Sequence, residues 1–261
     1  MRSSAKTAVQ LARDWAGSLL GLASLLALWW AASHAQWVSK VFLPTPEATF
    51  SSLWEGLQQG DLAAYTGATV WRMVQGWLLA CVGGITLGAL VGISARARAW
   101  VLPTLEFLRP LPASAVIPLA ISLFGLSPNM VLAVVAFGAM WPVLLGTVHG
   151  FAHVPTRLRE VALALELPAF SYVSKMGLPH AMPDILAGMR LAMTVSLIVA
   201  VVGEMIASQS GLGQAILLAA RSFRASELFA GIVLLGAIGF VSNALLALAE
   251  RRLLVWQRSS S

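Results

Sequence analysis

Histidine and cysteine are side chains that commonly bind metal ions or take part in nucleophilic catalysis. In this sequence they are His34, Cys81, His149, His153 and His180. The histidines have no companion cluster of cysteines or carboxylates, which a zinc site would need, and a single cysteine cannot form a disulfide within the chain. The P-loop pattern Gly-x-x-x-x-Gly-Lys-Ser/Thr does not occur. We therefore expect no metal site and no nucleotide binding of the P-loop kind.

The polar stretch of residues 150–185 carries a second group of candidate residues. Apolar side chains recur there at i, i+3, i+4 and i+7, namely Leu158, Val161, Ala162 and Leu165. This spacing predicts a short amphipathic helix with Glu160 and Glu166 away from its apolar face. Thr156 can cap the start of the helix, and Pro168 ends it because proline cannot donate the next backbone bond. Connections of this length tend to be functional.

A second short helix is predicted for residues 169–176 of the same stretch. Gly177, Leu178 and Pro179 should end it, because glycine and proline interrupt helices. Pro183 and Asp184 then suit the first turn of the next helix, where proline needs no donor and a carboxylate faces the positive end of the helix. On periodicity alone, the two short helices could equally lie on a membrane surface.

Prolines interrupt the apolar segment 105–125 at Pro110, Pro112 and Pro118. A broken helix survives inside a membrane only where protein or a cavity satisfies its free backbone groups. The segment is therefore expected either to line a pathway or to form a packing kink. If it lines a pathway, Ser114 and Ser122 become polar contacts on that wall. Arg109 would serve as an anchor at the inner membrane boundary or as a contact for substrate.

Glu204 is an acidic residue near the end of another apolar run. A charge at the centre of a membrane helix costs about 2.5–3.5 kcal/mol on insertion scales, so such residues usually face a cavity or a partner. The side chain is therefore expected at a gate or on a pathway wall, or else close enough to the interface to be solvated. A glutamate in direct contact with substrate would repel an anion.

The elements that position these residues follow from composition. The 261 residues are 58% apolar and 11% charged, against roughly 25% charged in soluble domains. Six apolar runs have about the length that crosses a bilayer, and they cover residues 15–34, 69–94, 102–125, 129–149, 186–208 and 228–249. The sequence predicts an all-α polytopic membrane protein with one domain at residues 15–258, which follows a cytoplasmic N-terminal segment at residues 1–14.

Basic residues set the orientation of these runs. Thirteen lysines and arginines fall on the side of the N-terminus and four on the other. Because inner loops carry the excess of basic residues, both termini are expected in the cytoplasm. This distribution accounts for most of the net charge of +6 without nucleic acid. The first run ends near a sequence that could pass for a signal-peptidase site, but its length and flanking tryptophans favour a retained helix.

Small residues form a stripe on the second run. Ala80, Gly84, Gly88 and Gly92 recur at four-residue spacing, which places them on one helix face and lets another helix approach closely. We interpret this stripe as a helix-packing surface.

The sequence motifs of the polar stretch resemble those of a known family. Glu160-Val161-Ala162, followed by Leu178-Pro179 and Pro183, is similar to the EAA loop of permease subunits of binding-protein-dependent ABC importers. Further motifs match in order, namely Leu43-Pro44-Thr45-Pro46, Arg109-Pro110-Leu111-Pro112, Gly188-Met189-Arg190, Gly203-Glu204-Met205 and Ser210-Gly211-Leu212-Gly213. Their spacing resembles the branch that imports nitrate, sulfonates, taurine and bicarbonate, which also contains permeases for vitamin precursors.

The resemblance implies a type I permease fold in the bacterial cytoplasmic membrane. It implies two permease copies, expected as a homodimer, with two ATPase subunits that bind ATP and Mg²⁺ and an extracytoplasmic solute-binding protein. The chain itself would hold no cofactor and catalyse nothing. Within the EAA-like loop, Glu160 and Ala162 would face the ATPase. The family pattern has glycine where this chain has Glu166, and Leu167-Pro168 could supply the turn that glycine would otherwise make.

Two other classes of protein share some of these features. An ion-coupled secondary transporter is also apolar with broken helices, but it usually shows inverted repeats and ionisable groups at the midplane. An intramembrane enzyme would need a nucleophile or a metal constellation in its spans. Neither pattern is evident in this sequence, so ATP-driven import is the leading prediction.

Overall fold

The computed structural model describes residues 2–254, and it describes side chains within this range except at residues 2–15, 18, 19, 159 and 169. Met1 and residues 255–258, which the sequence assigns to the N-terminal segment and the permease domain, lie outside the described residues. The described chain contains helices and turns and no strand. The all-helical prediction is therefore confirmed for this part of the chain.

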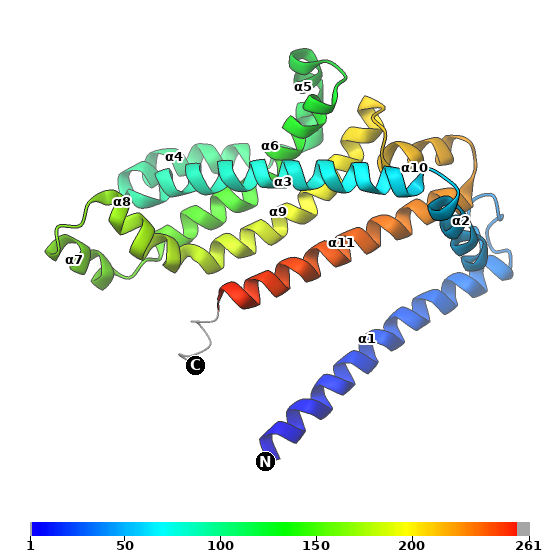
Figure 1. Ribbon diagram of the computed structural model, residues 1–261, viewed down its shortest axis with the longest axis horizontal. Coiled ribbons are helices and arrows are strands. Elements are labelled where there is room, and N and C mark those ends of the chain that lie inside the picture. Colours follow the sequence, from blue (N-terminus) through cyan, green and yellow to red (C-terminus); the bar gives the residue numbers. More distant parts are fainter. Residues whose placement is uncertain (1, 255–261) are drawn as a thin grey trace. The chain divides into compact units, whose positions relative to one another are not determined.

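The helices follow one another with short connections (Figure 1). In order they are α1 (Arg2–His34), α2 (Pro46–Gln58), α3 (Leu62–Ile93), α4 (Ala95–Leu108), the 3₁₀ helix η1 (Ala113–Val116), α5 (Ile117–Phe124), α6 (Pro128–Ala152), α7 (Thr156–Ala164), α8 (Ala169–Tyr172), the π-helix η2 (Val173–Gly177), α9 (Leu178–Ala207), α10 (Leu212–Arg221) and α11 (Ala225–Leu253).

Four of the described helices are long and apolar enough to cross a membrane, namely α3, α6, α11 and the continuous helix Phe170–Ala207. A fifth crossing is formed if Ala95–Leu108 and Ala113–Phe124 act as one span, but these helices are bent by 85°. The predicted break in the third run, residues 102–125, is thus confirmed. Pro110 and Pro112 each lack a backbone donor, so the chain turns between α4 and η1.

The first predicted run, residues 15–34, lies within the helix α1. Side chains of α1 are described at residues 16, 17 and 20–34, and among them the apolar helix Leu20–His34 is found. The structure therefore gives four or five spanning helices among the described residues, where the sequence predicts six. The difference concerns this first run and the bent third run.

The chain divides into two compact units, one of residues up to 63 with Ile216–Val233, and the other of residues 64–215 with those from 234 onward. In the smaller unit, Trp29 Nε1 donates a hydrogen bond to the Pro44 carbonyl oxygen at 2.9 Å. The Trp29 ring also lies 5.7 Å from that of Phe229. These contacts fix the end of α1 against the segment that follows it.

The core of the larger unit is the pair formed by α6 and α9. A Cβ added at Gly150 would lie 2.6 Å from Ala181 Cβ, and one added at Gly146 would lie 2.7 Å from the Asp184 carbonyl oxygen. A Cβ added at Gly188 of α9 would likewise lie too close to the Pro142 carbonyl oxygen of α6. The helices are antiparallel, because successively later residues of α6 contact successively earlier residues of α9. Only glycine allows backbones to approach this closely.

The small-residue stripe of α3 packs on a neighbouring face of α6, about 100° around the helix from the face that meets α9. A Cβ added at Gly84, Gly88 or Gly92 would lie 2.6–2.8 Å from the Cβ atoms of Val143, Thr147 and Phe151. These distances leave no room for a larger side chain. The interpretation of the stripe as a packing surface is confirmed. The other face of α3, with Leu79, Val82 and Leu90, is exposed.

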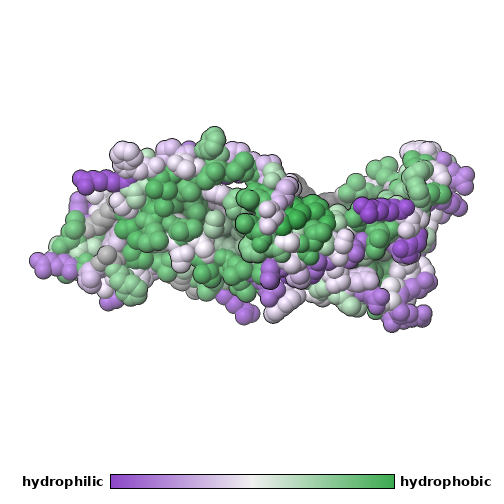
Figure 2. All heavy atoms as spheres, turned by 90° about the horizontal axis from the view of Figure 1, so that it is seen from above, coloured by the Kyte–Doolittle hydropathy of each residue, from purple (hydrophilic) through white to green (hydrophobic). Residues whose placement is uncertain are grey.

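Apolar side chains cover much of the visible surface (Figure 2). Many large apolar residues are exposed along α3 and α9, including Leu78, Val82, Leu90, Leu191 and Ile198. In a soluble protein, contiguous apolar surface of this kind would cause aggregation. On helices long enough to cross a membrane, the same surface is suited to contact with lipid or with other membrane subunits.

Candidate functional site

The EAA-like loop begins with α7, whose start differs from the prediction. The N-cap position is Pro155, and no side chain caps the helix. Thr156 is the first helical residue, so its predicted role as a cap is wrong. The Leu158 N–H instead donates to the Pro155 carbonyl oxygen at 3.0 Å. Proline with its fixed φ can precede a helix directly, which makes a side-chain cap unnecessary here.

The loop turns at Glu166, which has a left-handed backbone with φ of 49°. The Leu167 N–H bonds to the Ala162 carbonyl oxygen (3.0 Å) and the Glu166 N–H to that of Leu163 (3.1 Å). This pair of bonds is the Schellman motif that commonly ends helices at glycine. The turn therefore lies at Glu166 itself, and the prediction that Leu167-Pro168 replaces it is wrong. The glutamate takes the conformation for which the family pattern has glycine.

Replacing Glu166 with glycine is expected to stabilise this turn. A left-handed conformation costs an L-residue about 1–2 kcal/mol, and the greater freedom of glycine in the unfolded chain removes roughly 0.5–1 kcal/mol of that gain. A net gain of about 1 kcal/mol slows amide exchange at Leu167 roughly fivefold. Hydrogen exchange of the Leu167 amide measures this. Glu166→Ala is the matched control, and equal protection in both variants would contradict the expectation.

The apolar face of α7 is only partly buried within the chain. Ala162 is 7% exposed and Leu158 is half-buried, whereas Val161 and Leu165 are exposed. Leu163 on another side of α7 (78% exposed) and Phe170 on α8 (82% exposed) are further exposed apolar side chains of the loop. Glu160 is also exposed. The loop therefore presents four exposed apolar side chains, Val161, Leu163, Leu165 and Phe170, which we together call the loop surface.

The loop joins the membrane helix without a break. The prediction that residues 177–179 end the second loop helix and that the span starts near 186 is wrong, because Phe170–Ala207 is one continuous helix. The π-helical turn η2 precedes Pro179, and the Leu178 N–H bonds to the Val173 carbonyl oxygen. A wider turn gives the proline ring room. Gly177 is buried against the Phe151 ring, where a Cβ would lie 2.6 Å from its Cε1.

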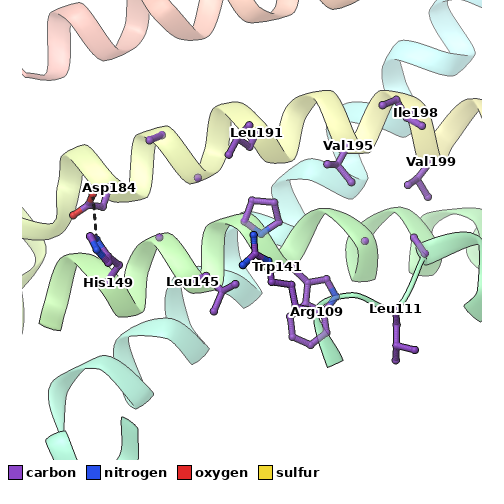
Figure 3. A pocket seen from close by; sticks show the side chains of 16 residues that line it. Arg109, Leu111, Trp141, Leu145, His149, Asp184, Leu191, Val195, Ile198 and Val199 are labelled. Carbon is purple, nitrogen blue, oxygen red and sulfur yellow. Dashed lines mark ion pairs between the residues drawn. The ribbon is translucent and has the colours of Figure 1, made fainter. Parts of the chain in front are cut away.

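A groove of about 710 Å³ lies along α6 and α9 at the break after α4, and we call it the central groove (Figure 3). Its lining includes Arg109, Leu111, Trp141, His149, Asp184 and Leu191. At one end, His149 Nδ1 lies 3.6 Å from Asp184 Oδ1. At the other end the walls are apolar, with Ile198 and Val199. Arg109 and Trp141 line the part between these ends (Figure 3).

The predicted pathway residues divide into two groups in the structure. Arg109 lines the central groove, together with Leu111 and Ala113 from the same segment. The others are exposed but do not line it, namely Pro110, Pro112, Ser114, Pro118 and Ser122. Sequence analysis missed Trp141, because a tryptophan in an apolar run carries no signal that separates a wall residue from a packing residue.

Glu204 lies in a buried polar network and lines neither described hollow. Its side chain is 0% exposed and forms an ion pair with Arg72. Its Oε2 accepts hydrogen bonds from Thr69 Oγ1 (3.0 Å) and the Gly213 N–H (2.9 Å). The network therefore ties the end of α9 to α3 and to the start of α10. Solvation of Glu204 at the interface, one of the two expectations, does not occur.

The motif Gly211-Leu212-Gly213 is explained by this network. A Cβ at Gly211 would collide with the Glu204 carboxylate, and one at Gly213 would collide with the Val201 carbonyl oxygen. The Leu212 N–H donates to Thr69 Oγ1 at 2.9 Å. Thr69 and Arg72 were not among the predicted site residues. The signal that could have found them is the need of a buried carboxylate for a cation and donors.

Spanning helices, a proline-broken segment and an apolar loop surface joined to a spanning helix define a multi-pass membrane permease. Residues 84–255 match the family described as binding-protein-dependent transport system inner membrane component, and the chain belongs to this family. It is the membrane-spanning permease subunit of an ABC importer, which works with ATPase and solute-binding partners. This assignment decides against the ion-coupled transporter.

Relatives and a solved structure support the assignment. A Bacillus subtilis relative named as the aliphatic sulfonates transport permease protein SsuC is 34% identical over 94% of this chain and 89% of its own length. The nitrate import permease protein NrtB of Leptolyngbya laminosa is 31% identical over 76% of this chain and 70% of its own. A chain of the inward-facing MetNI methionine ABC transporter has the same fold, with a TM-score of 0.64 at 18% identity, covering 74% of this chain and 95% of its own.

Proposed function

We propose that this permease imports a small oxyanion, with a sulfonate such as taurine as the first candidate and nitrate or bicarbonate next. The names of the sulfonate and nitrate relatives support this proposal. A vitamin precursor is the second candidate within the same machine. We further propose that two copies of the chain form the pathway, that both termini are cytoplasmic, and that the chain catalyses no reaction itself.

The loop surface is proposed to dock on the ATPase subunit, which binds ATP and Mg²⁺. The observation that carries this proposal is the exposed apolar surface at Leu163 and Phe170 on helices that lead directly into the groove-lining helix α9. Apolar side chains this exposed are favoured at protein interfaces. Because the helix is continuous from Phe170 to Ala207, a displacement of the loop would move the α9 wall of the central groove.

The first test is to purify the permease from native membranes in mild detergent and to identify the bound chains by mass spectrometry. An ATPase is expected with it. A binding protein that co-purifies with the permease can then be titrated with taurine, nitrate, bicarbonate and vitamin precursors, which identifies the cargo by its binding. A permease that carries no ATPase in either native or crosslinked membranes would overturn the proposal.

Glu160→Lys is expected to reduce uptake about tenfold or more while ATP hydrolysis by the assembled complex continues. Glu160 is exposed on α7 beside the loop surface. Reversing a charge at an interface weakens binding by several kcal/mol and alters how the two proteins align. Uptake into proteoliposomes and phosphate release measure the two activities. Glu55→Lys, at an exposed residue of α2, is the control and should leave both unchanged. Normal uptake by Glu160→Lys would count against docking through α7.

A further inference from the structure

We propose that Arg109 and Trp141 form an oxyanion-binding element within the central groove, where they contact the charged group of the cargo. The inference rests on the proposed import function, since it assumes that the groove lies on the pathway. It assigns a role to Trp141, which no sequence motif singles out, and it gives the groove a chemical preference for sulfonate-like, planar or tetrahedral oxyanions.

The first observation is the unsatisfied indole of Trp141. The residue is 8% exposed, and its Nε1–H has no acceptor among the described residues. Buried tryptophans usually find a partner for this group. Trp77 in the same unit does so, since its Nε1–H donates to the Met189 carbonyl oxygen at 2.9 Å. The Nε1 atom itself is closed off in this conformation, so a ligand that supplies the missing acceptor reaches it when the groove wall opens locally.

The second observation is the unpaired guanidinium of Arg109. Arg109 is exposed, whereas three arginines of the larger unit that have acceptors are partly buried: Arg72 pairs with Glu204, Arg190 with Glu250, and Arg98 donates to the Gly92 carbonyl oxygen. For Arg109, the part of the chain described by the structure provides no hydrogen bond or ion pair, although its side chain lines both the central groove and the adjoining hollow.

Trp141 and Arg109 both lie part-way along the central groove. Trp141 is the fourteenth of the 25 residues of the spanning helix α6, so it lies near the middle of that helix. Arg109 lines the groove at the break between α4 and η1, between the polar and apolar ends (Figure 3). Arg109 is exposed at this break, a position compatible with a boundary anchor as well as with a substrate contact.

The charges around the element favour an anion. Asp184 is the one carboxylate that lines the described central groove, and it faces His149 at the polar end. Glu106 and Arg98 line the adjoining hollow of about 520 Å³, not the central groove. Glu204 is buried away from both hollows and paired with Arg72. The part of the groove at Arg109 and Trp141 is thus lined by donors and apolar side chains.

The donor geometry suits the class of cargo proposed. A guanidinium presents paired N–H groups that bind two oxygens of one anion, and the indole N–H adds a donor for another oxygen. Sulfonate, nitrate and bicarbonate each carry three oxygens. The apolar walls at Leu145, Leu191 and Val195 would accommodate the organic part of a sulfonate, for which nitrate and bicarbonate have no counterpart.

A direct test uses the indole N–H as the probe. The permease with its ATPase, labelled with ¹⁵N-tryptophan in nanodiscs, is titrated with sodium methanesulfonate, and Trp141→Phe identifies the resonance. The Trp141 N–H signal should move downfield and saturate, the Trp77 signal should stay, and Arg109→Met should abolish the movement. An unchanged Trp141 signal would overturn the proposal. An identical movement with sodium chloride would also overturn it, because the site would then show no preference for oxyanions.

Transport gives the second test, in proteoliposomes that contain the permease, its ATPase and its binding protein. Arg109→Met is expected to reduce uptake of the labelled sulfonate about tenfold or more, the loss expected for a charge-assisted hydrogen bond. Trp141→Phe should raise the KM about fivefold, whereas Trp77→Phe should leave it unchanged. ATPase co-purification and binding-protein-stimulated hydrolysis should persist in all variants. Wild-type uptake in Arg109→Met would refute this element, whereas an absent ATPase in the wild type would refute the proposed function.

Discussion

Arg72→Ala is expected to destabilise the permease by about 3–5 kcal/mol, because it leaves the Glu204 carboxylate buried without its counter-ion. Glu204 is fully buried, and Arg72 is the cation paired with it. The remaining donors, Thr69 Oγ1 and the Gly213 N–H, cannot neutralise the charge. A loss of this size is a large fraction of the stability of a typical domain. Little folded protein should therefore accumulate in the membrane.

The measurement is the yield of monodisperse permease together with its thermal unfolding in detergent. Glu250→Gln provides the control, because the Arg190–Glu250 pair is only partly buried and such pairs contribute about 1 kcal/mol or less. Arg72→Met combined with Glu204→Leu removes both charges and should recover much of the lost stability. Equal stability of Arg72→Ala and wild type, or of the single and double variants, would show that the network does not hold α3, α9 and α10 together.

Leu163→Asp combined with Phe170→Asp is expected to abolish retention of the ATPase. Each of these exposed side chains contributes about 1.5–3 kcal/mol if the interface buries it fully. Loss of both therefore weakens binding roughly 10²-fold to 10⁴-fold before the added cost of burying carboxylates is counted. Because both residues already face away from the chain's own core, the permease itself should fold normally.

Retention is measured by quantifying the ATPase that co-purifies with tagged permease, and folding by thermal unfolding of the same sample. Trp54→Asp is the matched control, since Trp54 is a large exposed apolar residue of α2 that lies outside the loop. It should keep the ATPase. If the double variant also kept a full complement of ATPase while folding normally, the loop surface would not be the docking site, and the role proposed for α7 and α8 would fail.

Local sequence signals predicted a substantial part of the fold. The four-residue spacing of Gly84, Gly88 and Gly92 correctly indicated a packing face, because helical periodicity places such residues on one side whatever the partner is. Pro110 and Pro112 correctly indicated a break in the third run, because a missing donor and a fixed φ act within a few residues. Polar residues 150–185 marked the loop for the same local reason.

Other features depended on contacts that no local pattern contains. The continuity of the helix through Gly177 and Pro179 was missed because glycine and proline usually end helices, whereas here a π-helical turn and close packing on Phe151 retain the helical path. The left-handed turn at Glu166 was missed because the Schellman bonds, donated to the Leu163 and Ala162 carbonyl oxygens, outweigh the preference of glutamate for other conformations.

The sequence by itself determined the class of protein, the locations of the apolar segments, and the location and motifs of the loop. Hydropathy and short motifs are properties of neighbouring residues, so they can be found without the tertiary structure. Tertiary structure alone decided which side chains meet. Glu204 finds Arg72 and Thr69 across more than 130 residues of chain, and Arg109 shares a groove with Trp141 from another helix. Burial, pairing and the lack of a partner arise only when helices pack, and these three properties define the candidate sites.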